Sequence, residues 1–555
     1  MGATSVQDRL RELHFKAYEA NERRIRALVS APRRFERSDL DTYERELIES
    51  IPDEWTPAAP AELRARIRKA RVILVGDYHT LRQSQRGFLR VLRAIRSRRL
   101  VIALEFVMAR YQRHVDAYLA GRLDETAFLR RIEYHRSWPS YQVWPNFKPI
   151  FDHARLHGLP VVALDCEPAE CQTVFSRAAF ASWRIAEALR DHPHARVAVL
   201  MGEAHLAPSH LPAQLRQALD RIGLPAPILT IHQTLDPLYF ELVRRGLENR
   251  VDVVRLTEDR YYVPVSTPLA AQHSFLAAVS DEPWTARPED SQALRREFAR
   301  SVRTLARLLG LPVSRRLRTV RVFGPGCIEG LSSALSGLPA DLDVAVQAQV
   351  RDGESVCLPE HDFVCLAEPT PTHIAEEAAH FLKATTAGGP VPEDPNDFFY
   401  SRVLHEAIGY FGSKTANPKR KPPSAAAIRD RAAQALDSER KDLAFSEFVA
   451  AMLALWHRRA ASRRTFARDS LDRYVRDSGF AAGLGDLGPE VIRPLVHLIG
   501  YELGERLYTA FDDRSLSVRE IRRLFRTDFE APGAAFPTYH HLARRLRSIT
   551  LAPRF

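Results

Sequence analysis

The chain contains 555 residues, which is too many for one hydrophobic core, so roughly two to four domains are expected. Its 45% hydrophobic and 27% charged residues are typical of a globular protein, and a chain of this size needs no disulfide scaffold. The formal net charge is +11. Because the arginines are spread along the chain among acidic residues, we interpret most of them as solvated on helix faces and expect no clear nucleic-acid partner.

The cysteines and the apolar segments limit the class of protein further. The five cysteines include no Cys-x-x-Cys pair, which excludes a zinc ribbon and predicts buried free thiols in a reducing compartment. No signal-like segment follows Met1, and the longest apolar stretch, residues 448–456, is too short to span a bilayer. We therefore expect a cytoplasmic protein with no transmembrane segment.

The predicted elements begin with a charged helical extension over residues 1–60, which ends in a Pro-rich connector. Short apolar runs rich in Val and Ile follow, separated by segments with helical periodicity. Each run is continuous rather than alternating, which is typical of parallel strands that are covered by helices on both faces. The five predicted strands are Val72–Val75, Leu100–Leu104, Val161–Leu164, Val197–Leu200 and Ile228–Ile231.

Strands that alternate with helices indicate right-handed βαβ units. Residues 61–285 are therefore predicted to form an α/β domain with an open, mainly parallel sheet flanked by helices. The gap between the second and third strands is longer than the others and contains an aromatic insert. We interpret this insert as a lid or a pocket wall; its aromatic residues are Trp138, Tyr141, Trp144 and Phe147.

Residues 286–555 are predicted to form an α-rich domain with a small β-hairpin element. The alternation of apolar residues over Val344–Val350 predicts a strand, Asp352-Gly353 predicts a hairpin turn, and a second short strand is predicted over Phe363–Leu366. The rest is predicted to be helical, except that the basic, Pro-containing residues 417–424 are interpreted as an exposed linker.

Ionisable residues follow all five predicted strands. Ligands of an open parallel sheet bind at the carboxyl ends of its strands, so these residues are expected at one edge. Two of the strand ends share the pattern Gly-acid-x-His, in which the glycine allows a sharp turn and a close approach to the backbone. We therefore predict one shared site, formed by Gly76, Asp77, Tyr78, His79, Glu105, Asp165, Gly202, Glu203, His205 and His232.

Three kinds of chemistry suit this set of residues. Two histidines with a carboxylate can bind a divalent metal such as zinc, manganese or iron. A histidine beside an acid can act as a general base whose tautomer the acid holds. A histidine or Tyr78 can also ligate a haem iron, and the aromatic insert would suit a flat apolar ligand. The residue types alone do not choose among these.

These motifs give the segment over residues 65–245 a family resemblance. It resembles the ChaN-like haem-binding domain, within the wider Tiki/TraB and erythromycin-esterase superfamily. The resemblance rests on the paired Gly-acid-x-His motifs with Glu105 between them, on the runs Ala103–Gln112 and His114–Gly121, on the Trp-rich segment through Trp144, and on the strand Leu159–Asp165.

The resemblance implies several functions, because the superfamily is chemically diverse. ChaN-like members bind haem, Tiki-like members are metal-dependent proteases, and the esterase branch opens lactones with a histidine base. The family pattern assigns central roles to His79, Glu105 and His205, with Asp77 and Glu203 beside them. This chain departs from the pattern in having Asp77 where relatives usually carry Glu, and in lacking the lipoprotein signal of ChaN itself.

Our leading hypothesis is a protein that binds haem or iron at this site, fused to a helical partner domain. The alternative is a metal-dependent hydrolase in which His79, Glu105 and His205 hold or orient the reactive water. A scaffold with a decayed site is a third hypothesis, against which the intact pair of histidines argues. The expected partners are haem or another small molecule and a second copy of the chain in a homodimer, and the sequence leaves open whether the site is catalytic.

Overall fold

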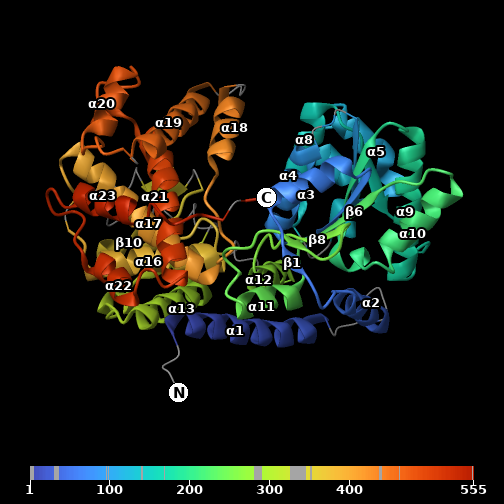
Figure 1. Ribbon diagram of the computed structural model, residues 1–555, viewed down its shortest axis with the longest axis horizontal. Coiled ribbons are helices and arrows are strands. Elements are labelled where there is room, and N and C mark those ends of the chain that lie inside the picture. Colours follow the sequence, from blue (N-terminus) through green and yellow to red (C-terminus); the bar gives the residue numbers. More distant parts are fainter. Residues whose placement is uncertain are drawn as a thin grey trace. The chain divides into compact units, whose positions relative to one another are not determined.

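The computed structural model describes residues 5–29, 37–95, 97, 99–138, 142–167, 169–279, 291–324, 346–350, 353–389, 391–436, 441–461, 463–552 and 554–555 (Figure 1). The chain divides into two compact units, Phe15–Asp281 with Ala552–Phe555 and Met1–His14 with Glu282–Leu551. We call them the α/β unit and the helical unit. Among the described residues, no helix is both long enough and apolar enough to cross a membrane.

The α/β unit is built on an eight-stranded, mainly parallel sheet with the strand order β1-β7-β8-β6-β2-β5-β3-β4. The five predicted strands are confirmed as the neighbours β6-β2-β5-β3-β4, which pair in parallel. Three short strands that the sequence did not reveal extend the sheet beyond β6. The strands are β1 (Thr56–Pro57), β2 (Val72–Asp77), β3 (Leu100–Met108), β4 (Val161–Asp165), β5 (Arg196–Gly202), β6 (Ile228–His232), β7 (Val254–Arg255) and β8 (Arg260–Tyr262).

Successive residues of each central strand face opposite layers of helices. Ile73 and Val75 of β2 lie in a core with α3, α4, α5, α6 and α8, whereas Val72 and Leu74 lie in a core with α9 and α10. Burial on both faces explains why the strands are continuous apolar runs. The helices of this unit are α2 (Arg37–Glu49), α3 (Pro60–Lys69), α4 (Arg82–Ile95), η1 (Ala109–Tyr111), α5 (Gln112–Leu119), α6 (Glu125–Arg131), α7 (Tyr134–Ser137), α8 (Trp144–His157), α9 (Val174–Asp191), η2 (Glu203–Leu206), α10 (Leu211–Arg221), α11 (Asp236–Arg244) and α12 (Pro268–Val279), and α1 (Val6–Val29) contains the boundary between the units.

The helical unit packs around one large apolar core, in which α17 packs against both α16 and α21. A three-stranded sheet, β10-β11-β9, lies in the same unit and contains the small hairpin β10–β11. Its elements are α13 (Ser291–Leu309), η4 (Arg315–Arg318), β9 (Arg321–Phe323), β10 (Val356–Leu358), η6 (Pro359–His361), β11 (Phe363–Cys365), α16 (Pro371–Thr386), α17 (Pro395–Ala416), α18 (Ala425–Leu436), α19 (Lys441–Ala460), α20 (Ser470–Asp477), η7 (Leu484–Asp486), α21 (Pro489–Asp512), α22 (Val518–Arg526) and α23 (Ala535–Arg545).

The prediction of a strand over Val344–Val350, as the first arm of a hairpin, is wrong. Residues 346–350 are helical, and Val344 lies outside the described residues. Val346 and Val350 are buried together against the small sheet. A spacing of four residues places two side chains on one face of a helix as well as on one face of a strand, so the alternation was ambiguous.

The prediction of an exposed basic linker at 417–424 is also wrong for its first half. Lys419 is only 5% exposed. Arg420 binds Glu376 at 2.8 Å and lies between the rings of Tyr410 and Tyr501, at 4.7 and 4.8 Å from their centroids. Glu376 and the two tyrosine rings replace the water that would otherwise solvate the Arg420 guanidinium. This basic segment can therefore lie in the packed interior.

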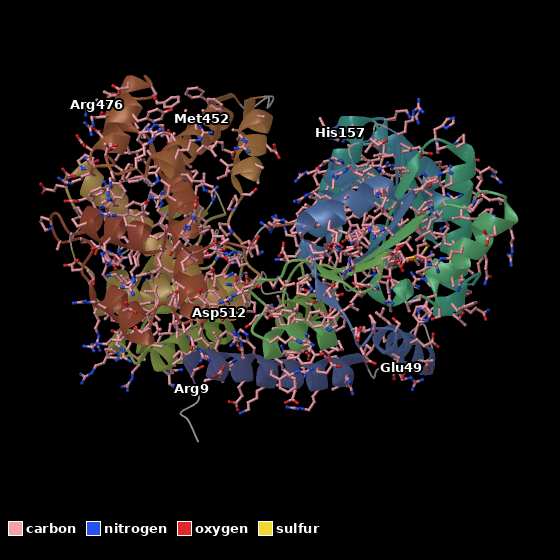
Figure 2. The ribbon with its side chains drawn as sticks, viewed as in Figure 1. Arg9, Glu49, His157, Met452, Arg476 and Asp512 are labelled. Carbon is pink, nitrogen blue, oxygen red and sulfur yellow. A yellow bond between two sulfur atoms is a disulfide. The ribbon has the colours of Figure 1, made fainter. Side chains whose placement is uncertain are left out.

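Two of the predicted free thiols are instead joined. Cys166 and Cys171 form a disulfide in the loop between β4 and α9, where their Cα atoms are 6.1 Å apart (Figure 2). Their separation of five residues matches no Cys-x-x-Cys pattern, so no sequence motif indicated the pairing. Cys357 is a free thiol, as predicted, and is half-buried, whereas Cys365 is buried.

Candidate functional site

The site lies at the carboxyl edge of the five parallel strands. The strand order places the ends of β6, β2, β5, β3 and β4 side by side, although they are separated along the chain by long helical connections. Along this edge His232, Asp77, Gly202 and Asp165 are the last residues of β6, β2, β5 and β4. Glu105 lies between Gly202 and Asp165 in this order, on β3, directly after the last residue of β3 that pairs with β5 and before the end of β3 at Met108. Hydrogen bonds then divide them into three groups.

The first motif forms an Asp-His pair. Asp77 is 4% exposed, and its Oδ2 lies 2.7 Å from His79 Nδ1 while its Oδ1 accepts a hydrogen bond from Gln85 Nε2 at 2.5 Å. Burial alone would lower the pKa of His79, but the hydrogen bond to Asp77 and the charge of that carboxylate raise it above its ordinary value. The pair therefore fixes both the ring orientation of His79 and its affinity for a proton.

The second ring nitrogen of His79, Nε2, lies on the partly exposed side of the imidazole. Its side chain is 31% exposed, and no described residue forms a hydrogen bond with Nε2. The indole of Trp138 meets the imidazole edge-on at a centroid distance of 5.0 Å. Asn146, on α8, donates weak hydrogen bonds of 3.4 and 3.3 Å to the carbonyls of His79 and Thr80. The aromatic insert thus supplies one wall beside His79, as the sequence suggested, with Tyr141 outside the described residues.

The second motif, Gly202–His205, has the same sequence pattern but forms different hydrogen bonds. Glu203 does not hold His205; its Oε1 lies 2.7 Å from Nδ1 of His232. Its Oε2 accepts from the backbone N–H groups of Gln233 and Thr234, both at 2.9 Å. Glu203 therefore anchors the end of β6, and Gly76 makes room for it, because a Cβ there would lie 2.2 Å from Glu203 Oε2.

His205 belongs to a separate buried group. Its Nδ1 lies 3.1 Å from the hydroxyl of Tyr43, and its Nε2 lies 3.5 Å from Glu105 Oε1. Burial lowers the pKa of His205, despite the opposing effect of Glu105. In the neutral tautomer with hydrogen on Nε2, both ring nitrogens have a partner, so His205 has no nitrogen left for a ligand.

Glu105 is the centre of this buried group. Its Oε1 accepts from Arg177 Nη2 at 2.8 Å and its Oε2 accepts from the backbone N–H of Gly202 at 2.6 Å. Arg177 also binds Asp165 Oδ1 at 2.8 Å, so one guanidinium joins the ends of two strands. Burial opposes ionisation of Glu105, but Arg177 and His205 hold its pKa well below the ordinary value.

Gly202 is the point where the three central residues meet. A Cβ added to it would lie 3.3 Å from Glu105 Oε2, 3.5 Å from His205 Cδ2 and 4.0 Å from His79 Cε1. The structure thus brings together His79, Glu105 and His205, as the sequence suggested. Tyr78 is half-buried, and its backbone N–H donates to Ser84 Oγ at 3.4 Å. Among the described residues, no group of three or more His, Cys, Asp or Glu side chains is arranged to hold a metal ion.

Two members of the site escaped sequence reasoning. Arg177 lies in the first turn of α9, where its position after the Thr173 cap carries no motif. Tyr43 comes from α2, and its ring also stacks on His210 at a centroid distance of 3.4 Å. The one available sign was electrostatic, since a strand-end acid that is fully buried needs a cationic partner from somewhere in the chain.

Comparison with known proteins finds a family model that matches part of this unit. Residues 63–193 match the family model described as "Haem-binding uptake, Tiki superfamily, ChaN". No curated protein matches the chain. Among solved structures, one titled "Cofacial heme binding to ChaN of Campylobacter jejuni" is similar, at 12% identity and a TM-score of 0.27, over 32% of this chain and 87% of that one. On the family-model match, residues 63–193 are a ChaN-like segment of the Tiki superfamily.

Proposed function

We propose that the α/β unit binds haem, with His79 Nε2 as the protein ligand of the iron. The observation that carries this proposal is the asymmetry between the two motif histidines. His79 is partly exposed, with Nδ1 held by Asp77 and Nε2 open, whereas His205 is 4% exposed and both of its ring nitrogens have partners. A histidine held through one nitrogen and open at the other is the usual form of a metal-ligating histidine.

Haem fits this arrangement better than a free divalent ion. The porphyrin supplies four nitrogen ligands itself, so the protein need supply only one or two axial ligands. A zinc site needs three or four protein ligands at bonding distance. The described residues offer no such group, while they do offer a single oriented imidazole.

The surroundings of His79 support the same proposal. Trp138 meets His79 edge-on, and it stacks on Phe106, which in turn stacks on Phe147 at a centroid distance of 4.5 Å. Phe106 and Phe147 are buried beneath Trp138, so the ring of this stack that can meet a planar apolar ligand is the Trp138 indole, which the two phenylalanines support. When bound, haem would supply redox or gas-binding chemistry at its iron, while Asp77 would orient His79 and increase its basicity as a ligand.

The Asp77–His79 pair would also suit a general base in a hydrolase. The test must therefore separate ligation from hydrolysis. Haemin titrated into the purified full chain should give a shifted Soret band at one equivalent, and His79→Ala should abolish it. Tyr78→Phe should leave it unchanged, because we assign the ligand to the imidazole.

Three results would decide against this assignment. A Soret band that is lost in Tyr78→Phe and kept in His79→Ala would move ligation to the phenol. Absence of any band, with stoichiometric zinc or manganese by elemental analysis, would favour the metal-dependent hydrolase. A band that is unchanged in both variants would place haem elsewhere on the chain.

A further inference from the structure

The helical unit carries a row of exposed arginines along α13. Arg296, Arg300, Arg303 and Arg307 follow one another at intervals of four, three and four residues, and all four are exposed. This spacing keeps them on one face of the helix. Arg300 pairs with Glu297 at 3.0 Å, whereas no described residue forms an ion pair with the other three.

A second row lies on α22, next to the first. Arg519, Arg523 and Arg526 are exposed at intervals of four and three residues. The two helices touch, because Arg522 Nε donates to the carbonyl of Leu309 at 2.6 Å, and both pack on α16 (Figure 1). The solvent-facing sides of these two neighbouring helices carry six exposed arginines, which we call the arginine face: Arg296, Arg303 and Arg307 with Arg519, Arg523 and Arg526.

Little negative charge offsets this surface. Residues 291–321 contain nine arginines and one acid, Glu297, which is paired with Arg300. On α22 the acid is Glu520, which accepts hydrogen bonds from Ser517 and pairs with Arg545. In the sequence the arginines are spread among acidic residues, but the fold brings the six arginines of the arginine face together on two adjacent helices.

We propose that the arginine face binds the phosphate backbone of a nucleic-acid duplex. Arg296 and Arg307 are eleven residues apart, which is about 16 Å along the helix axis at 1.5 Å per residue. Along its axis a duplex presents one phosphate of each strand about every 3.4 Å, so a stretch of duplex as long as this row carries about five phosphates of each strand. Guanidinium groups bind phosphate oxygens in a two-pronged geometry that Lys cannot reproduce.

The same surface is poorly suited to a membrane. A helix that binds a bilayer leaves an apolar face free to enter it. On α13 the apolar residues Phe298 and Val302 are wholly buried in the core of the unit, as are Ile521 and Phe525 on α22. Only the charged side of each helix remains, which favours a polyanion that is recognised through its charges.

The experiment is a fluorescence-anisotropy titration of the full chain into a labelled 20-base-pair DNA duplex at several salt concentrations. Six phosphate contacts predict a slope of about −5 for log K against log salt, and thus a loss of about a thousandfold between 50 and 200 mM salt. Arg296→Gln/Arg303→Gln/Arg307→Gln should reduce the slope by about 3 and weaken binding by at least tenfold at 100 mM salt.

A control variant removes the same charge elsewhere. Arg68, Arg131 and Arg221 are exposed in the α/β unit, and their joint replacement by Gln should leave the slope within about one of that of the wild type. Equal losses in the two triple variants would overturn the proposal, because binding would then depend on net charge alone. Binding to phosphatidylserine vesicles without binding to the duplex would overturn it in favour of a membrane. The thermal unfolding midpoints of both triple variants are compared with that of the wild type to show that the variants are folded.

Discussion

The Asp77–His79 pair gives the most detailed prediction, which concerns the replacement Asp77→Asn. The Asp77 carboxylate accepts from two donors, His79 Nδ1 at 2.7 Å and Gln85 Nε2 at 2.5 Å. An asparagine offers one acceptor oxygen, so its amide nitrogen must face one of the two donors. His79 then keeps at most a hydrogen bond to a neutral amide oxygen, which is weaker than its bond to the carboxylate.

The magnitude follows from the bond that is lost. A hydrogen bond to a charged group contributes about 1.5–3 kcal/mol, and loss of a carboxylate behind a metal-bound histidine typically weakens ligation about 10–100-fold. Because burial lowers the pKa of His79 and Asp77 is the main group that opposes it, the variant should also lower that pKa relative to the wild type. Only the neutral imidazole binds iron, so the pH below which haemin dissociates should move downward in Asp77→Asn.

The assay is haemin affinity from the Soret band, measured from pH 5 to pH 9 for the wild type and the variant. Glu203→Gln is the matched control, because Glu203 is the acid of the second motif and contacts His232 rather than either motif histidine. It should lower the free energy of unfolding and leave haemin affinity unchanged. If Asp77→Asn binds haemin as tightly as the wild type, with the same pH midpoint, the assigned role of the pair is wrong.

Three further predictions concern the buried supports of the site. Glu105→Gln removes the more buried of the two carboxylates that Arg177 contacts and should cost about 3 kcal/mol in urea denaturation; a cost below about 1 kcal/mol would contradict the buried pair. Gly76→Ala places a methyl 2.2 Å from Glu203 Oε2 and should cost about 1–3 kcal/mol in thermal unfolding; a neutral effect would mean that Glu203 is mobile. Tyr43→Phe loses one hydrogen bond and should cost about 1 kcal/mol, with haemin affinity unchanged; a lost Soret band would give the phenol a direct role.

The sheet and the general position of the site could be predicted because both depend on local patterns. Continuous apolar runs such as Val72–Val75 occur only where both faces of a strand are covered, and parallel strands place their ends at one edge. The residues that follow these runs then lie along one edge of the sheet in any strand order. This is why His79, Glu105 and His205 could be grouped from the sequence alone.

The connections within the site could not be predicted, because they depend on the strand order. β5 lies between β2 and β3, so His205 meets Glu105 of β3 rather than the acid of its own motif. Arg177 and Tyr43 reach the site from distant helices, and no periodicity records such contacts. Two motifs of the same pattern therefore have different roles, which follow from their neighbours in the fold.

The most direct test of the account is chemical rescue of the proposed ligand. In His79→Gly the imidazole is removed, and the haemin Soret band should disappear and then return when free imidazole is added, since the vacated position can hold the free base. In His205→Gly the band should persist without imidazole, because His205 is committed to Tyr43 and Glu105. An unchanged Soret band in His79→Gly, or a band that only His205→Gly removes and imidazole restores, would contradict the assignment of His79.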